Sequence, residues 1–277
     1  KLDAPERVLE LSAAANPEIQ SAFRVLGLAD QGALLSHGFG PYNVMRIDDE
    51  GKRKGKDFST TNADINALIQ LGDTVLLLEN NGRISHCILA DLSKPPIRTW
   101  QVEVTSLWDA AMVDYPQILV VDNEGGQVLL YDLETKKTEI KVKGLNSPSS
   151  IAYDDTGDKK MCAVAEQGKH RVLLYDENWK EMNEVGTQGN DMSKLKAPTC
   201  CRFLPPVGNA KRGNLLIADR DNHRLSEYTH QGKFIRHWLI AKEGIKHPVT
   251  FSFVFPSVWV VHSPGQRNVS KYQIYDE

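Results

Sequence analysis

A carboxylate followed five residues later by a basic side chain recurs in the second half of this sequence. Asp219 precedes Arg224, Glu166 precedes Arg171, and a weaker copy at 122–127 pairs an aspartate with a glutamine. Each carboxylate ends an apolar run and each partner begins the next, so the two side chains lie on either side of a short turn. A carboxylate and a guanidinium placed in this way can close a hairpin with a charged pair. We therefore expect Glu166–Arg171 and Asp219–Arg224 to be structural ion pairs.

Metal and catalytic chemistry find little support in the residue pattern. His37 and His262 end equivalent apolar runs, but two imidazoles without a third ligand make a poor zinc site. Calcium sites need several carboxylates, which the runs expected to be innermost mostly lack. No G-x-S-x-G, P-loop or H-E-x-x-H motif occurs. We expect no metal, no cofactor and no enzyme activity in this segment, and a metal-dependent hydrolase or lyase is the weakest alternative.

The elements that must hold these side chains repeat along the chain. Short apolar strands that end in a polar residue, often Tyr-Asp, close at positions 48, 91, 132, 176, 229 and 276, at spacings of 41 to 53 residues. A second apolar run precedes each of them: Ala33–His37, Thr74–Glu79, Gln117–Asp122, Lys160–Glu166, Asn214–Asp219 and Ser257–His262. Further runs come before or after most of these pairs, and Gly- or Asn-containing turns separate them.

Six repeats of about four short strands each predict an all-β fold, a six-bladed β-propeller. The last repeat stops after its third strand, whereas the strand Arg7–Ser12 stands spare before the first full repeat. We expect that N-terminal strand to complete the last blade. No linker-like stretch divides the chain, so residues 1–277 are predicted to form one propeller domain. Helical periodicity is weak outside the first 20 residues.

One blade signature is specific. The fifth repeat reads Gly213-Asn-Leu-Leu-Ile-Ala-Asp219-Arg-Asp-Asn222-His223-Arg224-Leu225, and the fourth, from Val164 to Val172, is a weaker copy. This run resembles the NHL repeat, whereas the Trp-Asp of WD40 blades and the Gly-Gly pair of kelch blades each occur only once, at 108–109 and 125–126. The resemblance implies an NHL-type propeller from the C-terminal part of a cytoplasmic TRIM-NHL protein. Several members bind single-stranded RNA and repress mRNAs, and any ubiquitin-ligase activity belongs to an N-terminal part that this chain lacks.

The loops between the second and third strands share one rim of a propeller with the crossovers between blades. In the last three repeats the loops on this rim hold more basic than acidic residues, accompanied by amides and histidines. Cations for phosphates, rings for stacking and amides for base edges are the components of single-stranded RNA recognition. The candidate RNA-binding residues are Tyr42, Arg83, His86, Lys169, His170, Lys194, Lys196, Arg220, Asn222, His223, Lys246, His247 and Arg267.

The charge balance and the residue composition bear on which functions and cellular settings are expected. The chain has 33 basic and 36 acidic residues and a net charge of −3, so a basic footprint over the whole surface is absent. A protein-interaction platform without RNA binding therefore remains the alternative function.

The four cysteines show no C-x-x-C spacing and are expected to be buried thiols in a reducing compartment. No apolar run could span a bilayer and no signal peptide is evident, so we expect no membrane contact. A cytoplasmic location is what the NHL-type resemblance implies. A start at Lys1 suggests a piece of a longer protein.

Overall fold

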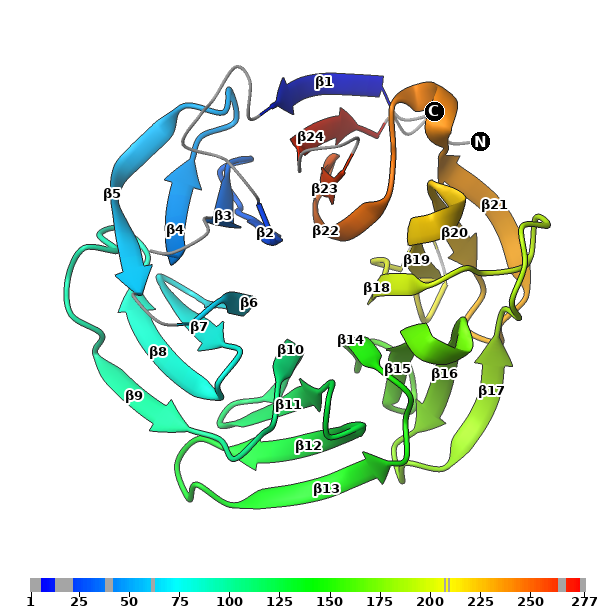
Figure 1. Cartoon of the computed structure of the whole chain (residues 1–277), viewed down its shortest axis with the longest axis horizontal. Coiled ribbons are helices and arrows are strands. Elements are labelled where there is room, and N and C mark those ends of the chain that lie inside the picture. Colours follow the sequence, from blue (N-terminus) through cyan, green and yellow to red (C-terminus); the bar gives the residue numbers. More distant parts are fainter. Residues whose placement is uncertain are drawn as a thin grey trace. The chain divides into compact units, whose positions relative to one another are not determined.

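The computed structural model describes residues 6–12, 22–37, 42–60, 63–206, 208, 210–263 and 268–274. Within these ranges the chain forms 24 strands and three short 3-10 turns. The strands make six antiparallel sheets of four strands each (Figure 1). The predicted fold class is confirmed: the protein is all-β, with six four-stranded blades of a β-propeller.

The chain divides into two compact units, Lys1–Glu103 with Lys242–Glu277, and Val104–Ala241. The first unit contains blade one, β2 (Arg24–Gly27), β3 (Ala33–His37), β4 (Tyr42–Ile47) and β5 (Arg53–Thr60); blade two, β6 (Ile65–Leu71), β7 (Thr74–Glu79), β8 (Arg83–Ile88) and β9 (Arg98–Gln101); and blade six, β22 (Pro248–Val254), β23 (Ser257–His262), β24 (Asn268–Gln273) and β1 (Glu6–Leu11). Its strand β2 contacts both β22 and β6.

The second unit contains the other three blades. They are blade three, β10 (Leu107–Asp114), β11 (Gln117–Asp122), β12 (Gln127–Asp132) and β13 (Thr138–Lys143); blade four, β14 (Pro148–Asp154), β15 (Met161–Glu166), β16 (Arg171–Asp176) and β17 (Glu181–Val185); and blade five, β18 (Pro198–Phe203), β19 (Leu215–Asp219), β20 (Arg224–Tyr228) and β21 (Phe234–Leu239). Strand β14 contacts β10 and β18, so the first strands of the three blades are neighbours.

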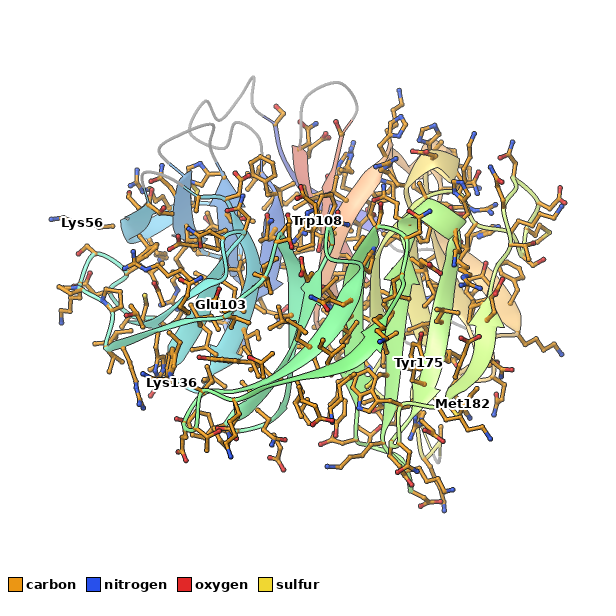
Figure 2. The ribbon with its side chains drawn as sticks, turned by 60° about the horizontal axis from the view of Figure 1, so that its bottom comes forward. Lys56, Glu103, Trp108, Lys136, Tyr175 and Met182 are labelled. Atoms are coloured by element: carbon orange, nitrogen blue, oxygen red, sulfur yellow. The ribbon has the colours of Figure 1, made fainter. Side chains whose placement is uncertain are left out.

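Burial within a blade explains why its strands differ in composition. The second strands β7, β11, β15 and β23 are covered on both faces and read as continuous apolar runs. The fourth strands pair on one side only and expose side chains such as Lys56 of β5 and Met182 of β17 (Figure 2). Charged side chains on such an edge discourage pairing with another chain.

Strand β1 completes blade six, as predicted. It pairs antiparallel with β24, with Glu10 opposite Ser270 and Leu11 opposite Val269. Leu11 is buried in the same apolar cluster as Val269, so the strand is held by packing as well as by its ladder. The described part of the first 20 residues is therefore a strand, and the rest of that stretch lies outside the described residues.

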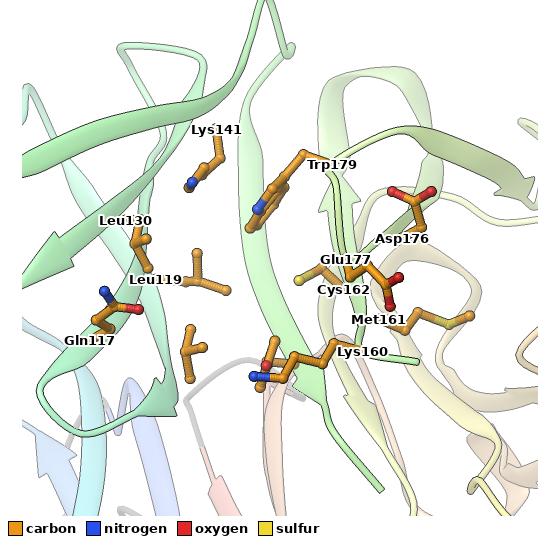
Figure 3. A pocket seen from close by; sticks show the side chains of 12 residues that line it. Gln117, Leu119, Leu130, Lys141, Lys160, Met161, Cys162, Asp176, Glu177 and Trp179 are labelled. Atoms are coloured by element: carbon orange, nitrogen blue, oxygen red, sulfur yellow. The ribbon is translucent and has the colours of Figure 1, made fainter. Parts of the chain in front are cut away.

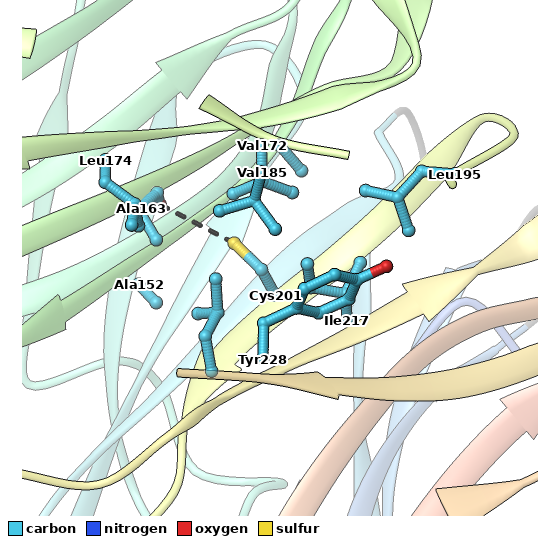
Figure 4. Packing of buried hydrophobic residues seen from close by; sticks show 11 residues of the cluster. Ala152, Ala163, Val172, Leu174, Val185, Leu195, Cys201, Ile217 and Tyr228 are labelled. Carbon is cyan, nitrogen blue, oxygen red and sulfur yellow. Dashed lines mark hydrogen bonds between the residues drawn. The ribbon is translucent and has the colours of Figure 1, made fainter. Parts of the chain in front are cut away.

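The core of the second unit lies between successive blades. Cys201 and Ile217 of blade five pack against Ala163 and Leu174 of blade four, with Tyr228 alongside them (Figure 4). The Cys201 thiol donates a hydrogen bond to the Ala163 carbonyl at 3.5 Å, and burial raises its pKa to about 12. All four cysteines are buried free thiols, as the sequence indicated.

Four strands were not expected. β10 and β18 carry charged residues on buried strands, Asp109 and Arg202, and β5 and β17 are polar edge strands. In β10 and β18 the charge interrupts the apolar run by which strands were recognised, and β5 and β17 lack such a run. Among the described residues, no helix is long and apolar enough to cross a membrane.

Candidate binding surface

The second strand of every blade in the second unit ends in a carboxylate with no exposed surface: Asp122, Glu166 and Asp219. Each accepts a hydrogen bond from a backbone N–H of the connection that arrives from the preceding blade. The donors are Ser106 to Asp122 at 2.9 Å, Asn146 to Glu166 at 2.8 Å, and Lys196 to Asp219 at 2.6 Å. The carboxylates therefore satisfy backbone donors where the chain passes between blades.

The third strand supplies a second partner for each carboxylate. Arg171 Nε lies 2.6 Å from Glu166 Oε2, and Arg224 Nε lies 2.8 Å from Asp219 Oδ2. In blade three the Gln127 amide takes the same place, 3.0 Å from the aspartate. Strand pairing sets these contacts, because the last residue of the second strand lies opposite the first residue of the third. The five-residue spacing in the sequence thus becomes a buried pair that closes each hairpin.

The two charged pairs differ in their electrostatics, because burial raises the pKa of Asp219 whereas it is outweighed at Glu166. Burial acts to raise the pKa of the Glu166 carboxyl, but the hydrogen bond from the Asn146 amide and the nearby Arg171 and Lys169 outweigh that effect. The pKa of Glu166 therefore lies below its ordinary value, and the side chain is ionised at neutral pH.

These pairs organise a surface that we call the crossover rim, formed by residues 123–126, 144–147, 167–170, 186–197 and 220–223. Arg224 Nη2 donates hydrogen bonds to the carbonyls of Asp191, at 2.8 Å, and Lys194, at 2.7 Å. Asn222 Nδ2 donates to the Gly189 carbonyl at 2.9 Å and to Asp219 at 2.8 Å. The long connection between blades four and five is therefore fixed to the β19–β20 hairpin.

Two histidines of the rim adopt left-handed backbone conformations. His170 and His223 have φ of 58° and 55° and follow the 3-10 turns η2 (Gln167–Lys169) and η3 (Arg220–Asn222). His170 Nδ1 accepts the backbone N–H of Ala197 at 2.9 Å. This hydrogen bond assigns His170 a structural contact on the rim, where the sequence suggested a ring for base stacking.

Replacing Asn222 by alanine is expected to lower the free energy of unfolding by about 1–2 kcal/mol, because the Gly189 carbonyl and Asp219 each lose a partly buried donor. Urea unfolding would measure the change. Gln188→Ala alters an exposed amide on the same connection and provides the matched control. Equal stabilities of the two variants would contradict a structural role for Asn222.

Most cations of the predicted RNA surface lie beside a carboxylate. The ammonium of Lys169 lies 3.3 Å from Glu166, that of Lys194 lies 2.8 Å from Asp191, and Arg220 Nε lies 2.8 Å from Asp221. In the first unit, Arg83 lies 3.8 Å from the buried Glu79, whose pKa is raised by burial. The rim is therefore mixed in charge at short range.

The remaining predicted residues are scattered. Lys196 is half-buried and, like His223, lies on the crossover rim, whereas Lys246 and His247 are exposed in the first unit. The side chain of Tyr42 and the whole of Arg267 lie outside the described residues.

His86 is a correction to the sequence prediction. It lies within β8, and its Nε2 is 2.7 Å from the Thr74 hydroxyl at the start of β7, away from the β7–β8 turn. Its ring stacks on Trp100, and burial lowers its pKa. A rim position was inferred because the start of β8 was not fixed by the sequence.

Sequence reasoning missed a polar network on the first strands of the second unit. Asp109 of β10 is buried and accepts hydrogen bonds from the Ser150 hydroxyl at 2.7 Å and from Arg202 Nη1 at 2.9 Å. The same guanidinium donates to the carbonyls of Ile151, at 3.1 Å, and Cys201, at 2.8 Å. The only signal was a charged residue inside an apolar stretch, in Leu107-Trp-Asp-Ala-Ala and Thr199-Cys-Cys-Arg-Phe.

This network holds the first strands of blades three, four and five together. Ser150 Oγ also accepts the Cys201 N–H at 3.2 Å, so its lone pairs and its proton are all engaged. Within the described ranges, no group of three His, Cys, Asp or Glu side chains is placed to hold a metal ion. The chemistry that the network offers is the neutralisation of a largely buried guanidinium.

Comparisons with known proteins bear on the fold. No protein-family model matches the sequence, and no curated protein matches it. Among solved structures, a luciferin-regenerating enzyme is similar with a TM-score of 0.70 and 13% identity, over 99% of this chain and 95% of that one. A streptogramin B lyase is similar with a TM-score of 0.64 and 9% identity, over 92% of this chain and 79% of that one. At these identities the likeness shows the propeller fold alone.

Proposed function

We propose that this chain is a binding module that recognises a protein partner through the crossover rim of its second unit. The supporting observation is the short-range alternation of charge described above, in which Lys169, Lys194 and Arg220 each lie within 3.3 Å of a carboxylate oxygen. Tracking a nucleic-acid backbone calls for a continuous positive surface. Interspersed charges of both signs suit the polar rim of a protein interface, where they select the partner.

The loops of the crossover rim are held in place by hydrogen bonds within the chain, which also supports this proposal. Arg224, Asn222 and His170 fix the loops from within the chain, so binding would not require ordering them. An NHL-type relationship is part of the proposal and draws support from the Asp219–Arg224 pair and its Glu166–Arg171 counterpart. We propose that the domain acts by binding and not by catalysis. RNA binding of the TRIM-NHL type on the same rim is the alternative that the experiment must separate.

Two parallel assays on the purified chain test the proposal. In the first, proteins captured from ribonuclease-treated lysate are quantified for the unaltered chain and for the double variant Lys169→Glu with Arg220→Glu. We expect a discrete set of proteins to be lost with the double variant and retained with Lys233→Glu, which reverses an exposed charge in the β20–β21 turn. An identical set with both variants would reject the rim as the binding surface.

In the second assay, labelled poly-U, poly-A and poly-C are titrated by fluorescence anisotropy at two salt concentrations. We expect no base preference and no affinity tighter than about 10 µM at physiological salt, since the neighbouring carboxylates oppose phosphate. Base-selective binding at micromolar or lower concentration, weakened by Lys169→Glu, would overturn the proposal in favour of RNA.

A further inference from the structure

A cleft of about 180 Å³ lies between blades three and four of the second unit, at the end of the sheets opposite the crossover rim (Figure 3). Its lining includes the basic side chains Lys141 and Lys160 and the carboxylates of Asp176 and Glu177. Charges of both signs select no class of ligand, so the cleft assigns no function to the second unit.

The crossover rim, by contrast, contains a hydrogen bond that only one protonation state of a side chain can make. His170 Nδ1 lies 2.9 Å from the backbone nitrogen of Ala197. The amide of Ala197 can only donate, so Nδ1 must offer its lone pair and we assign the ring proton to Nε2. An imidazolium carries a proton on both nitrogens and cannot accept this hydrogen bond. The contact therefore exists only while His170 is neutral.

The contact fixes the end of the connection 186–197, which joins blade four to blade five. Ala197 is buried, and the next residue, Pro198, begins β18. The preceding N–H, that of Lys196, donates to Asp219 of blade five at 2.6 Å. The end of the connection is thus tied both to the blade that it enters and to the blade that it leaves, and His170 supplies the tie to blade four.

The equivalent connection one blade earlier is built without this contact. Gly126 stands in blade three where His170 stands in blade four, because each directly precedes the first residue of the third strand. A glycine has no side chain with which to hold the end of the connection 144–147. The fold therefore does not require the imidazole contact, which is a particular feature of the passage from blade four to blade five.

The carboxylates around His170 are already committed to other cations. Glu166 lies 2.6 Å from Arg171, Asp191 lies 2.8 Å from Lys194, and Asp221 lies 2.8 Å from Arg220. An imidazolium would therefore add a positive charge without an uncommitted counter-charge among them. The charged groups on the elements around the contact are Glu166, Lys169, Arg171, Glu184, Asp191, Lys194, Lys196, Arg220 and Asp221.

A second imidazole acts on the same connection but keeps its neutral form in mild acid. Arg224, which holds the carbonyls of Asp191 and Lys194, also donates from Nη1 to His237 Nε2 at 3.3 Å. Burial and then Arg224 lower the pKa of His237 to about 4. His237 therefore remains neutral between pH 7 and pH 5, and the segment 191–194 stays fixed over that range.

We propose that His170 is a proton-operated latch of the crossover rim. In its neutral form the imidazole holds Ala197, and protonation of Nδ1 removes this hydrogen bond and frees the end of the connection from blade four. Partner binding through the rim then weakens in mild acid, a consequence that rests on the function proposed above.

NMR of the chain labelled with nitrogen-15 tests the latch without any partner. At pH 7 we expect a scalar coupling across the hydrogen bond, between the amide nitrogen of Ala197 and His170 Nδ1. As the pH falls to 5, this coupling should disappear while the ring becomes protonated. The Leu195 amide, which donates to the Thr187 carbonyl at 2.9 Å, should keep its chemical shift. A ring that is still neutral at pH 5, or a coupling that survives protonation, would overturn the proposal.

Two substitutions separate the acceptor from the proton. His170→Asn places an oxygen near the position of Nδ1, cannot be protonated, and tolerates the φ of 58°. His170→Gly suits the same backbone and removes the acceptor. At pH 7, hydrogen exchange of the Ala197 amide should be at least ~threefold faster in His170→Gly than in His170→Asn. Equal exchange in the two variants would contradict the latch. His230→Asn, in the β20–β21 turn, should match the unaltered chain.

Partner binding tests the regulatory consequence separately. Proteins captured at pH 7 on the unaltered chain and on His170→Asn are washed at pH 5.5. Proteins that depend on Lys169 and Arg220 should elute at least ~threefold more from the unaltered chain than from His170→Asn. Equal elution from both would reject regulation by His170. A capture at pH 7 with no such proteins would reject the proposed function and its regulation together, whereas the latch itself is decided by the NMR result.

Discussion

Asp109→Ala is expected to destabilise the protein by about 3 kcal/mol, the larger of two effects that single groups should show. The variant removes the carboxylate that accepts hydrogen bonds from two nitrogens of Arg202, at 2.9 and 3.2 Å, and from the Ser150 hydroxyl. A guanidinium whose side chain is 30% exposed then lacks its counter-charge. In thermal unfolding the loss should lower Tm by roughly 6–12 °C.

Asp158→Ala is the matched control, because Asp158 pairs with Lys211 at 2.6 Å while both side chains are about three-quarters exposed. That variant should change stability by less than about 0.5 kcal/mol. Replacing Asp109 by Leu and Arg202 by Met together should recover most of the loss, since neither charge is then left alone. A loss below about 1 kcal/mol for Asp109→Ala would contradict this account of the network.

Acidification from pH 7 to pH 5 should cost the protein about 2 kcal/mol of stability through His262. Burial lowers the pKa of this imidazole to about 4, and its Nε2 lies 2.8 Å from the Ser270 hydroxyl. In the unfolded chain a histidine titrates near pH 6.5. Between pH 6.5 and pH 4 the imidazole is therefore protonated in the unfolded state but not in the folded state. The stability present above pH 6.5 is lost as the pH falls toward 4.

Urea unfolding at pH 7, 6 and 5 measures this slope while most carboxylates remain ionised. His262→Gln removes the titration and should flatten the slope by about 1.2 kcal/mol per pH unit between pH 6 and 5. His237 acts in the same direction, because burial and then Arg224 lower its pKa to about 4. Parallel slopes for His262→Gln and the unaltered chain would show that the folded state accepts the proton.

The strands that could be predicted are those whose sequence alone reports their burial. β11 and β15 are apolar runs because both faces of a second strand are covered. β1 was recognised because it is one strand more than the first full repeat needs, while the last repeat lacks its fourth strand. β17 was missed because Glu-Met-Asn-Glu-Val contains no apolar run, unlike Val-Leu-Glu-Leu in the equally exposed β1. β18 was missed because its charge is neutralised by a residue 93 positions away.

The candidate site divides in the same way. The Glu166–Arg171 and Asp219–Arg224 contacts are local across one hairpin, so spacing revealed them. The contact of His170 with Ala197 joins segments 27 residues apart and leaves no trace in either segment.

The pairing of β1 with β24 has a consequence for synthesis on the ribosome. Residues 6–11 leave the ribosome some 260 residues before their ladder partner, residues 268–273. Until then β1 has no ladder partner, and its charged side chains Glu6, Arg7 and Glu10 discourage pairing with another chain. The last blade is thus completed only once nearly all of this sequence has been translated, and a chain that lacks residues 268–273 leaves β1 without its strand partner.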